Sequence, residues 1–328
     1  MDNSYIMRED NISSEMFLGD LKPWNLQELK KTMKIFVVNY NETEMEFDLV
    51  GVHPAIANAF RRILLSEVPT MAIEKVMIYN NTSLIQDEIL AHRLGLIPLK
   101  ADPRRFDFKS EDEGTERDTL EFELKIKCTK NTNAKPDSTN PDELYVNNNV
   151  YSKHIKWLPM GRQSNRMKEA DVGPVLDDIL IAKLRPGHEI DVKMLAVKGI
   201  GQDHAKFSPV ATATYRLLPQ IELVTDVEGE QAVRLQSCFS PGVIGIKEGS
   251  NGKKKAYVEN ARYDSCSRNV LRHNDLKDAV RMGRKRDHFI FTIESTGALT
   301  PDNLFLGSVD VLMKKCKDLL DKLNRLES

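Results

Sequence analysis

Residues 52–99 read VHPAIANAFRRILLSEVPTMAIEKVMIYNNTSLIQDEILAHRLGLIPL, and this stretch decides the fold. Pro54 suits the first position of a helix, where an N–H group would have no intrahelical acceptor, and Pro69 prevents the helix from continuing. The segment between the two prolines contains no glycine. We therefore predict a helix of about four turns between them.

One face of this predicted helix is apolar, and its members recur at helical spacing: Ile56, Phe60, Ile63 and Leu64. Arg61 and Arg62 have no acidic residue three or four positions away, so neither has an acidic partner within the helix. Two interpretations stay open for the arginines. They are either solvated charges on a surface helix or a pair that binds a group outside it.

The residues after Pro69 predict a strand and then a short helix. The run MAIEKVMIY is typical of a strand and ends at the turn residues Asn80 and Asn81. Residues 86–94 predict a short helix that Gly95 closes with a Schellman-type stop.

Taken residue by residue, NAFRRILLSEVPTMAIEKV followed by DEILAHRLGLIPL closely resembles the signature of the alpha-like subunits of multisubunit RNA polymerases. Further sequence motifs narrow the resemblance to the larger alpha-like subunits shared by eukaryotic RNA polymerases I and III. They are EFDLVG, YNNTS, LKADPRRFDF, GTERDTLEFEL, ELYVNNNVYS, KGIGQDHAKFSPVATATYRLLP, CFSPGVI and RDHFIFTIESTG. The resemblance covers residues from about 36 to the end.

The resemblance implies an α+β fold built from two domains. The first is a discontinuous alpha-like dimerisation domain of strands and two long helices, expected at residues 33–70 and 204–328. The second is a strand-rich insert domain at residues 71–203. Residues 1–32 are expected to form an N-terminal arm that Trp24 anchors.

The resemblance also implies that this subunit is not catalytic and acts in assembly. Such a subunit pairs with a smaller alpha-like subunit, and the pair is the platform for the second-largest polymerase subunit. Small zinc-binding subunits complete the set of partners, and the catalytic site lies in the two largest subunits. The implied setting is the nucleus, in nucleolus and nucleoplasm, where these polymerases transcribe the ribosomal RNA precursor, 5S rRNA, tRNA and small RNAs.

The last helix predicts the pairing surface. Thr300 and Pro301 start it, and a heptad seam follows: Phe305, Val309, Leu312, Cys316, Leu319, Leu323 and Leu326. A helix of about 25 residues is about 38 Å long, more than a small domain needs to cover. Burial of five or six such side chains contributes on the order of 10 kcal/mol before association costs.

By resemblance, specific residues make the two kinds of contact. The pairing interface or its core is assigned to Ile56, Phe60, Ile63 and Leu64, together with Phe305, Val309, Leu312, Cys316, Leu319 and Leu323. Docking of the second-largest subunit is assigned to Arg61 and Arg62, which match the arginine pair of the family motif. His92 and Arg93 match a family sequence motif at the edge of the insert domain and are expected to shape a docking surface.

Composition limits the other functions. A net charge of −2 and a pI near 6.4 argue against a surface that wraps nucleic acid, so no direct sequence-specific DNA binding is expected. The four cysteines are far apart and indicate neither disulfides nor a zinc site. The related subunit of RNA polymerase II binds zinc where this chain has FKSEDEGTERDT, which holds no thiol, so no metal and no cofactor are expected. No signal peptide or membrane-spanning run is apparent, and an intracellular protein is expected.

Periodicity predicts the remaining elements. IFVVNY and EMEFDLV predict a hairpin, and residues 120–128 a half-buried strand after an acidic loop at 107–118. ILIAKL and EIDVKMLAV predict a second hairpin around the turn at 185–188. Helices are expected at 229–239 and at 269–282, the latter ahead of the basic run RMGRKR, and DHFIFTIES predicts a strand.

Several alternatives compete with the scaffold interpretation. The loop KGIGQDHAKFSP offers a GxG and His204, which suggests a phosphate cradle or a general base, but GxGxxG between a strand and a helix is missing and a turn is favoured. An enzyme needs a nucleophile with a base, or paired carboxylates in a cleft, and the adjacent acids Asp177 and Asp178 lie at a predicted strand start and are unremarkable. An alpha-like subunit of a II-type or archaeal polymerase without its metal cluster, or a free-standing interaction scaffold, stays open.

Overall fold

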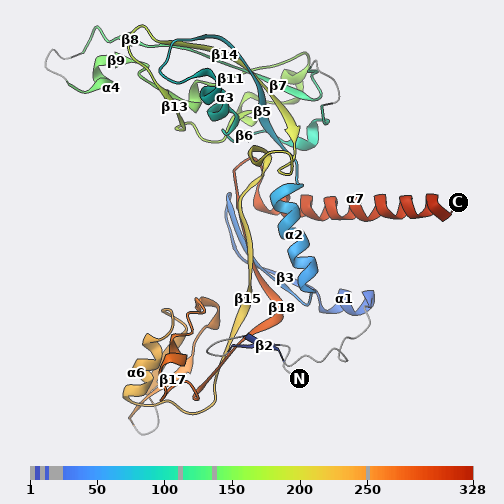
Figure 1. The fold of residues 1–328 in the computed structure, drawn as a ribbon, viewed down its shortest axis with the longest axis vertical. Coiled ribbons are helices and arrows are strands. Elements are labelled where there is room, and N and C mark those ends of the chain that lie inside the picture. Colours follow the sequence, from blue (N-terminus) through green and yellow to red (C-terminus); the bar gives the residue numbers. More distant parts are fainter. Residues whose placement is uncertain are drawn as a thin grey trace. The chain divides into compact units, whose positions relative to one another are not determined.

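A computed structural model describes residues 4–7, 12–14, 25–109, 114–134, 139–248 and 252–327. Figure 1 shows the fold of these residues. Contacts within the chain divide it into two units. Unit 1 comprises Met1–Asn39, Glu46–Asn58 and Thr214–Thr292, and unit 2 comprises Tyr40–Met45, Ala59–Ala213 and Ile293–Ser328. The predicted insert at 71–203 lies within unit 2, and its boundaries stay a prediction. Trp24 and residues 110–113 of the predicted acidic loop lie outside the described residues.

The largest sheet has six strands, in the order β2-β1-β18-β4-β3, with β15 also paired to β18. Its members are β1 (Ser4–Met7), β2 (Ile12–Ser14), β3 (Lys34–Tyr40), β4 (Glu44–Val50), β15 (Val210–Leu223) and β18 (Val280–Ser295). Part of the predicted arm therefore belongs to a sheet, because β1 pairs antiparallel with β18. The arm ends in helix α1 (Leu26–Thr32), where the Asn25 side chain accepts the Gln27 N–H at 2.9 Å.

The predicted first hairpin is confirmed by β3 and β4. The alternation in β4 buries Met45, Phe47 and Leu49, and the Phe47 ring stacks on Phe291 at 5.3 Å. The opposite side of β4 carries acids: Arg262 Nε lies 2.9 Å from a Glu46 oxygen. Arg262 Nη1 lies 2.7 Å from Asp48 Oδ1. One arginine thus ties the polar side of the strand to the 3-10 helix Ala261–Tyr263.

A smaller cluster in unit 1 contains α6 (Glu230–Ser237), β16 (Ile244–Glu248) and β17 (Lys254–Val258). Helix α6 confirms the helix predicted at 229–239. The helix predicted at 269–282 is wrong, because only a 3-10 helix, Asn269–Arg272, forms there and β18 begins at Val280. Val280 and Met282 are both buried at the two-residue period of a strand, so the basic run belongs to β18.

Unit 2 holds a four-stranded antiparallel sheet in the order β11-β7-β14-β5. Its strands are β11 (Lys156–Leu158), β7 (Thr119–Lys127), β14 (Glu189–Gly199) and β5 (Thr70–Asn81). Leu120, Phe122, Leu124 and Ile126 are buried, which confirms the half-buried strand predicted at 120–128. Helix α3 (Asp87–Gly95) lies against β5.

The second predicted hairpin is wrong. Strand β13 (Leu180–Lys183) pairs with β10 (Asn149–Tyr151), while both edges of β14 are occupied by β5 and β7. The turn at 185–188 forms, with the His188 N–H donating to the Arg185 carbonyl at 2.9 Å, but the flanking strands diverge to different partners. The remaining short elements of unit 2 are β6 (Leu99–Lys100), β8 (Thr129–Lys130), β9 (Tyr145–Val146), β12 (Gly173–Pro174), α4 (Pro141–Leu144) and α5 (Gln163–Arg166).

Two long helices have the predicted ends. Helix α2 (Pro54–Ser66) begins at Pro54 and stops before Pro69. Helix α7 (Pro301–Glu327) begins after Thr300, and Figure 1 draws it as one uninterrupted helix. Among the helices of the described residues, none is long and apolar enough to cross a membrane.

Candidate interaction surface

The apolar side of α2 is covered by the chain itself. Phe60, Ile63 and Leu64 are buried, and Ile56 is half-buried. The Phe60 ring lies 5.3 Å from the Phe305 ring of α7. Phe60, Ile63 and Leu64 therefore belong to this chain's own core, one of the two alternatives predicted for them, and their part in pairing stays a prediction.

The first half of α7 is also covered. Leu304 and Ser308 are buried, and Phe305, Val309 and Leu312 are half-buried. A Cβ added at Gly307 would lie 3.6 Å from Val68 Cγ1, which places this part of α7 in contact with the segment that follows α2. The covered part of the predicted seam thus packs within unit 2.

The second half of α7 differs, because every side chain from Met313 to Leu326 is exposed. Leu319 is 61% exposed, Leu323 55% and Leu326 84%. We call the apolar side chains of this half the α7 strip: Met313, Cys316, Leu319, Leu320, Leu323 and Leu326. A continuous apolar strip on an exposed helix indicates a surface that another molecule covers.

An ion pair lies where the covered half of α7 gives way to the exposed half. Lys315 Nζ lies 2.7 and 2.8 Å from the two carboxylate oxygens of Glu67, in the turn after α2. Both groups belong to unit 2. The pair ties α7 to this turn near the start of the exposed half of the helix.

The predicted docking residues lie in different settings. Arg61 is half-buried and Arg62 exposed on α2. Arg93 is engaged within the chain: its Nε donates to the Ile181 carbonyl at 2.9 Å and its Nη2 to the Leu180 carbonyl at 2.7 Å. The guanidinium thus fastens α3 to β13, and its assignment to a docking surface stays a prediction.

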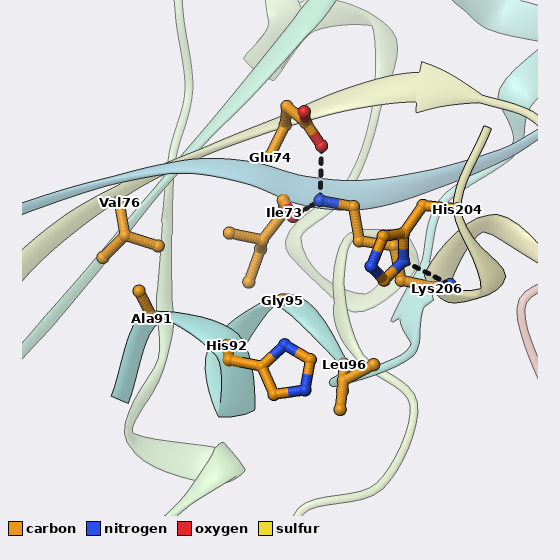
Figure 2. A pocket seen from close by; sticks show the side chains of 9 residues that line it. All are labelled: Ile73, Glu74, Val76, Ala91, His92, Gly95, Leu96, His204 and Lys206. Atoms are coloured by element: carbon orange, nitrogen blue, oxygen red, sulfur yellow. Dashed lines mark hydrogen bonds and ion pairs between the residues drawn. The ribbon is translucent and has the colours of Figure 1, made fainter. Parts of the chain in front are cut away.

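His92 lines a hollow of ≈ 250 Å³, which we call the His92 pocket (Figure 2). Strand β5 contributes Ile73, Glu74 and Val76, helix α3 and its C-cap contribute Ala91, His92, Gly95 and Leu96, and the segment after β14 contributes His204 and Lys206. Sequence reasoning did not connect His92 with the last two residues, because they are more than a hundred positions apart in the chain. The antiparallel pairing of β5 with β14 brings them together.

The loop that carries His204 is a packed turn, as predicted. His204 Nδ1 accepts the N–H of Lys206 at 3.1 Å and so caps the 3-10 helix Ala205–Phe207. A Cβ at Gly201 would overlap the Leu65 carbonyl, so the glycine permits close approach of two backbones. This packing function explains the glycine without a phosphate ligand.

No group of three or more His, Cys, Asp or Glu side chains suited to a metal ion occurs in the part of the chain that the structure describes. The four thiols lie apart in four different settings: Cys128 and Cys238 are buried, Cys266 is half-buried and Cys316 is exposed on α7. Burial raises the pKa of Cys128 and of Cys238, which keeps both thiols protonated. That the chain needs no metal or cofactor stays a prediction.

The sequence model of the RNA polymerase Rpb3/Rpb11 dimerisation domain matches residues 46–316, from β4 into α7. The chain belongs to this family. It is 58% identical over 306 residues, 93% of this chain and 88% of the relative, to the DNA-directed RNA polymerases I and III subunit RPAC1 of Mus musculus.

The sequence identity of this Rpb3/Rpb11 family member to two further relatives differs with the polymerase for which each relative is named. Identity is 48% over 321 residues, 95% of each chain, to the subunit of the same name from Saccharomyces cerevisiae. It falls to 30% over 307 residues, 90% of this chain and 96% of the relative, for the DNA-directed RNA polymerase II subunit rpb3 of Dictyostelium discoideum. The family match includes both α2 and the first half of α7.

Proposed function

We propose that this chain is the larger alpha-like subunit shared by RNA polymerases I and III. It pairs with a smaller alpha-like subunit, and the pair is the platform on which the second-largest subunit assembles. The observation that carries the assignment is the identity of 58% and 48% to subunits named for polymerases I and III, against 30% to one named for polymerase II. The II-type alternative is correspondingly disfavoured.

The function is structural. The catalytic site lies in the two largest subunits of the enzyme, and this chain holds no metal or cofactor of its own. Small zinc-binding subunits are further partners. The chain acts in nucleolus and nucleoplasm, where it supports synthesis of the ribosomal RNA precursor, 5S rRNA, tRNA and small RNAs.

The α7 strip supports the pairing. Its four leucines are more than half exposed in this chain, at positions 319, 320, 323 and 326. Full burial of one fully exposed leucine contributes about 1.5–3 kcal/mol, and these four are 55–84% exposed, so covering them contributes about 4–8 kcal/mol before the costs of association. That gain suits a permanent helix-mediated pair, and the smaller alpha-like subunit is the occupant that the family's dimerisation domain implies.

Coexpression with the smaller alpha-like subunit tests the pairing. We expect the two full-length chains to elute as one complex at micromolar concentration, measured by size-exclusion chromatography with light scattering. Leu319→Glu with Leu323→Glu should separate them, because two carboxylates would have to be buried. Lys314→Glu is the control, since it changes the net charge by the same amount on the opposite side of α7. Separate elution of the unmodified chains would refute the pairing.

A second experiment tests the docking assignment of the α2 arginines. Arg61→Glu with Arg62→Glu should leave the pair with the smaller subunit intact and prevent recovery of the second-largest subunit in affinity purification. Bidentate bonds from an arginine to a carboxylate cannot be replaced by glutamate. If the substitution dissolves the pair instead, these arginines belong to the pairing side.

A further inference from the structure

We infer that the His92 pocket receives an acidic side chain, aspartate or glutamate, of a polypeptide that binds this chain during polymerase assembly. The inference rests on the proposed function, because it takes the partner to be a polymerase subunit. It assigns to His92, His204 and Gly95 a specific part in recognition. Figure 2 shows the three residues around one opening, with α3 on one side and the His204 loop on the other.

The pocket has an apolar floor and a polar rim. Ile73, Val76 and Ala91 supply aliphatic surface, while the two histidines and Lys206 supply nitrogen atoms. A volume of ≈ 250 Å³ equals about eight water molecules at about 30 Å³ each. The space therefore admits one side chain of several heavy atoms together with water.

The hydrogen bonds of His204 fix what it offers to a ligand. Since its Nδ1 accepts the Lys206 N–H, the proton of the neutral ring must be on Nε2. The outer nitrogen of the ring is then a donor. The His92 ring has no hydrogen-bond partner among the described residues, so it is also available.

Lys206 adds a further donor. Its ammonium group donates to the Ile73 carbonyl at 2.9 Å and forms an ion pair with Glu74. An ammonium group has three N–H bonds, so one is left for another acceptor. Glu74 is neutralised by the same pair and does not repel an incoming carboxylate as a lone acid would. The rim is thus richer in donors than in acceptors, which favours a carboxylate ligand.

Gly95 gives independent support, because nothing among the residues that the structure describes requires a glycine there. The predicted Schellman stop is absent: Gly95 is the last residue of α3 and does not adopt the left-handed conformation, and the helix ends with Leu96 N–H bonded to the His92 carbonyl. A Cβ at this position would lie 3.5 Å from the Ile73 carbonyl oxygen and 4.0 Å from Lys206 Cδ, both ordinary contacts. An alanine would fit and would favour the helix by about 1 kcal/mol.

The missing side chain leaves space inside the pocket. A methyl group at Gly95 would project between β5 and Lys206, where a ligand's side chain would rest on the floor. A glycine that costs helix stability without easing the backbone is explained by an occupant that needs this space.

The first experiment compares variants of the full-length chain by affinity purification of a tagged copy from cells. Gly95→Ala should leave the melting temperature unchanged or higher and reduce recovery of the two largest polymerase subunits at least fivefold. His204→Asn should reduce recovery about tenfold. An asparagine oxygen can still accept the Lys206 N–H and keep the turn, while the Nε2 donor is lost.

His188→Asn is the matched control. His188 Nδ1 accepts the Arg185 N–H at 3.4 Å in another turn of unit 2, so the same substitution is made in similar chemistry away from the pocket. Recovery should equal that of the unmodified chain. If Gly95→Ala and His204→Asn also recover both large subunits fully, the inference is wrong while the proposed function stands. If the unmodified chain recovers no polymerase subunit, the proposed function fails and the inference fails with it.

A second experiment tests the chemistry of the ligand. The full-length chain with nitrogen-15 histidine is titrated with N-acetylglutamate amide, and the ring signals are followed by NMR. We expect the His204 Nε2 signal to shift and saturate at millimolar concentration, with no such response to N-acetylglutamine amide and none at His188. Equal responses to the acid and the amide, or no response to either, would overturn the inference.

Discussion

Helices α2 and α7 carry the same kind of apolar pattern and differ in what covers it. The stripe of α2 is enclosed by this chain, with Leu64 fully buried, whereas the α7 strip beyond Met313 is exposed. Both stripes follow from helical periodicity of leucine, isoleucine and phenylalanine. The difference teaches that periodicity reveals which side of a helix must be covered, while only the packing of the chain reveals whether a partner is needed.

The largest expected effect is at the enclosed helix. Leu64→Ala removes a fully buried side chain of α2 and leaves a cavity, which should lower the free energy of unfolding by about 3 kcal/mol. Urea unfolding of the full-length chain, followed by circular dichroism, measures it. Leu306→Ala is the control, because that leucine is 60% exposed on α7 and should lose less than about 0.5 kcal/mol. Equal losses would mean that α2 is not enclosed.

A smaller effect is expected where the coverage of α7 ends. Lys315→Ala or Glu67→Ala should each lower the free energy of unfolding by no more than about 1 kcal/mol, because the pair is solvent-exposed and screened by salt. A double-mutant cycle in low and high salt isolates the interaction. A coupling that vanishes in low salt would show that α7 is not tied to the turn after α2.

The start of α7 has a pH-dependent contribution. A hydrogen bond from the Thr300 side chain, joined by the Asn303 N–H and the Tyr40 hydroxyl, holds the pKa of Asp302 below its usual 3.8, although partial burial opposes this. A depressed folded-state pKa means that ionised Asp302 stabilises the fold above about pH 4 and that this is lost as the pH falls through the folded-state value.

Asp302→Asn should therefore cost about 0.5 kcal/mol at pH 7, the usual scale for a carboxylate in the first turn of a helix. The difference from the unmodified chain should shrink as the pH falls from about 5 to 3. Urea unfolding at several pH values measures it, with Asp310→Asn, an exposed acid farther along α7, as control. A difference that grows toward low pH would contradict the assigned direction.

Local signals predicted the long elements well. Pro54, Pro69 and the Thr300–Pro301 pair mark helix ends because proline restricts the backbone directly, and the alternation of β4 and β7 marks strands because one side of each is buried. The resemblance supplied the family, which the family match confirms.

Failures of prediction occurred where distant parts of the chain decide the structure. Residues 280–282 form the start of β18, because this strand pairs with distant strands of the six-stranded sheet. Strand β13 does not pair with β14 as predicted, because β5 and β7 occupy both edges of β14. The sequence did not predict the His92 pocket for the same reason. Its two histidines come together only through the register of β5 and β14, and no local spacing encodes that register.

The smallest expected effect is at the exposed helix and tests the comparison most directly. Leu319→Ala with Leu323→Ala removes twice as many leucine side chains as Leu64→Ala, yet the free energy of unfolding of the isolated chain should change by less than about 0.5 kcal/mol. Alanine favours the helix, and neither leucine has core contacts to lose. The same variant should bind the smaller alpha-like subunit far more weakly, by calorimetric titration. A loss of several kcal/mol in the isolated chain would mean that its own residues cover the strip in solution, and the contrast between the two helices would disappear.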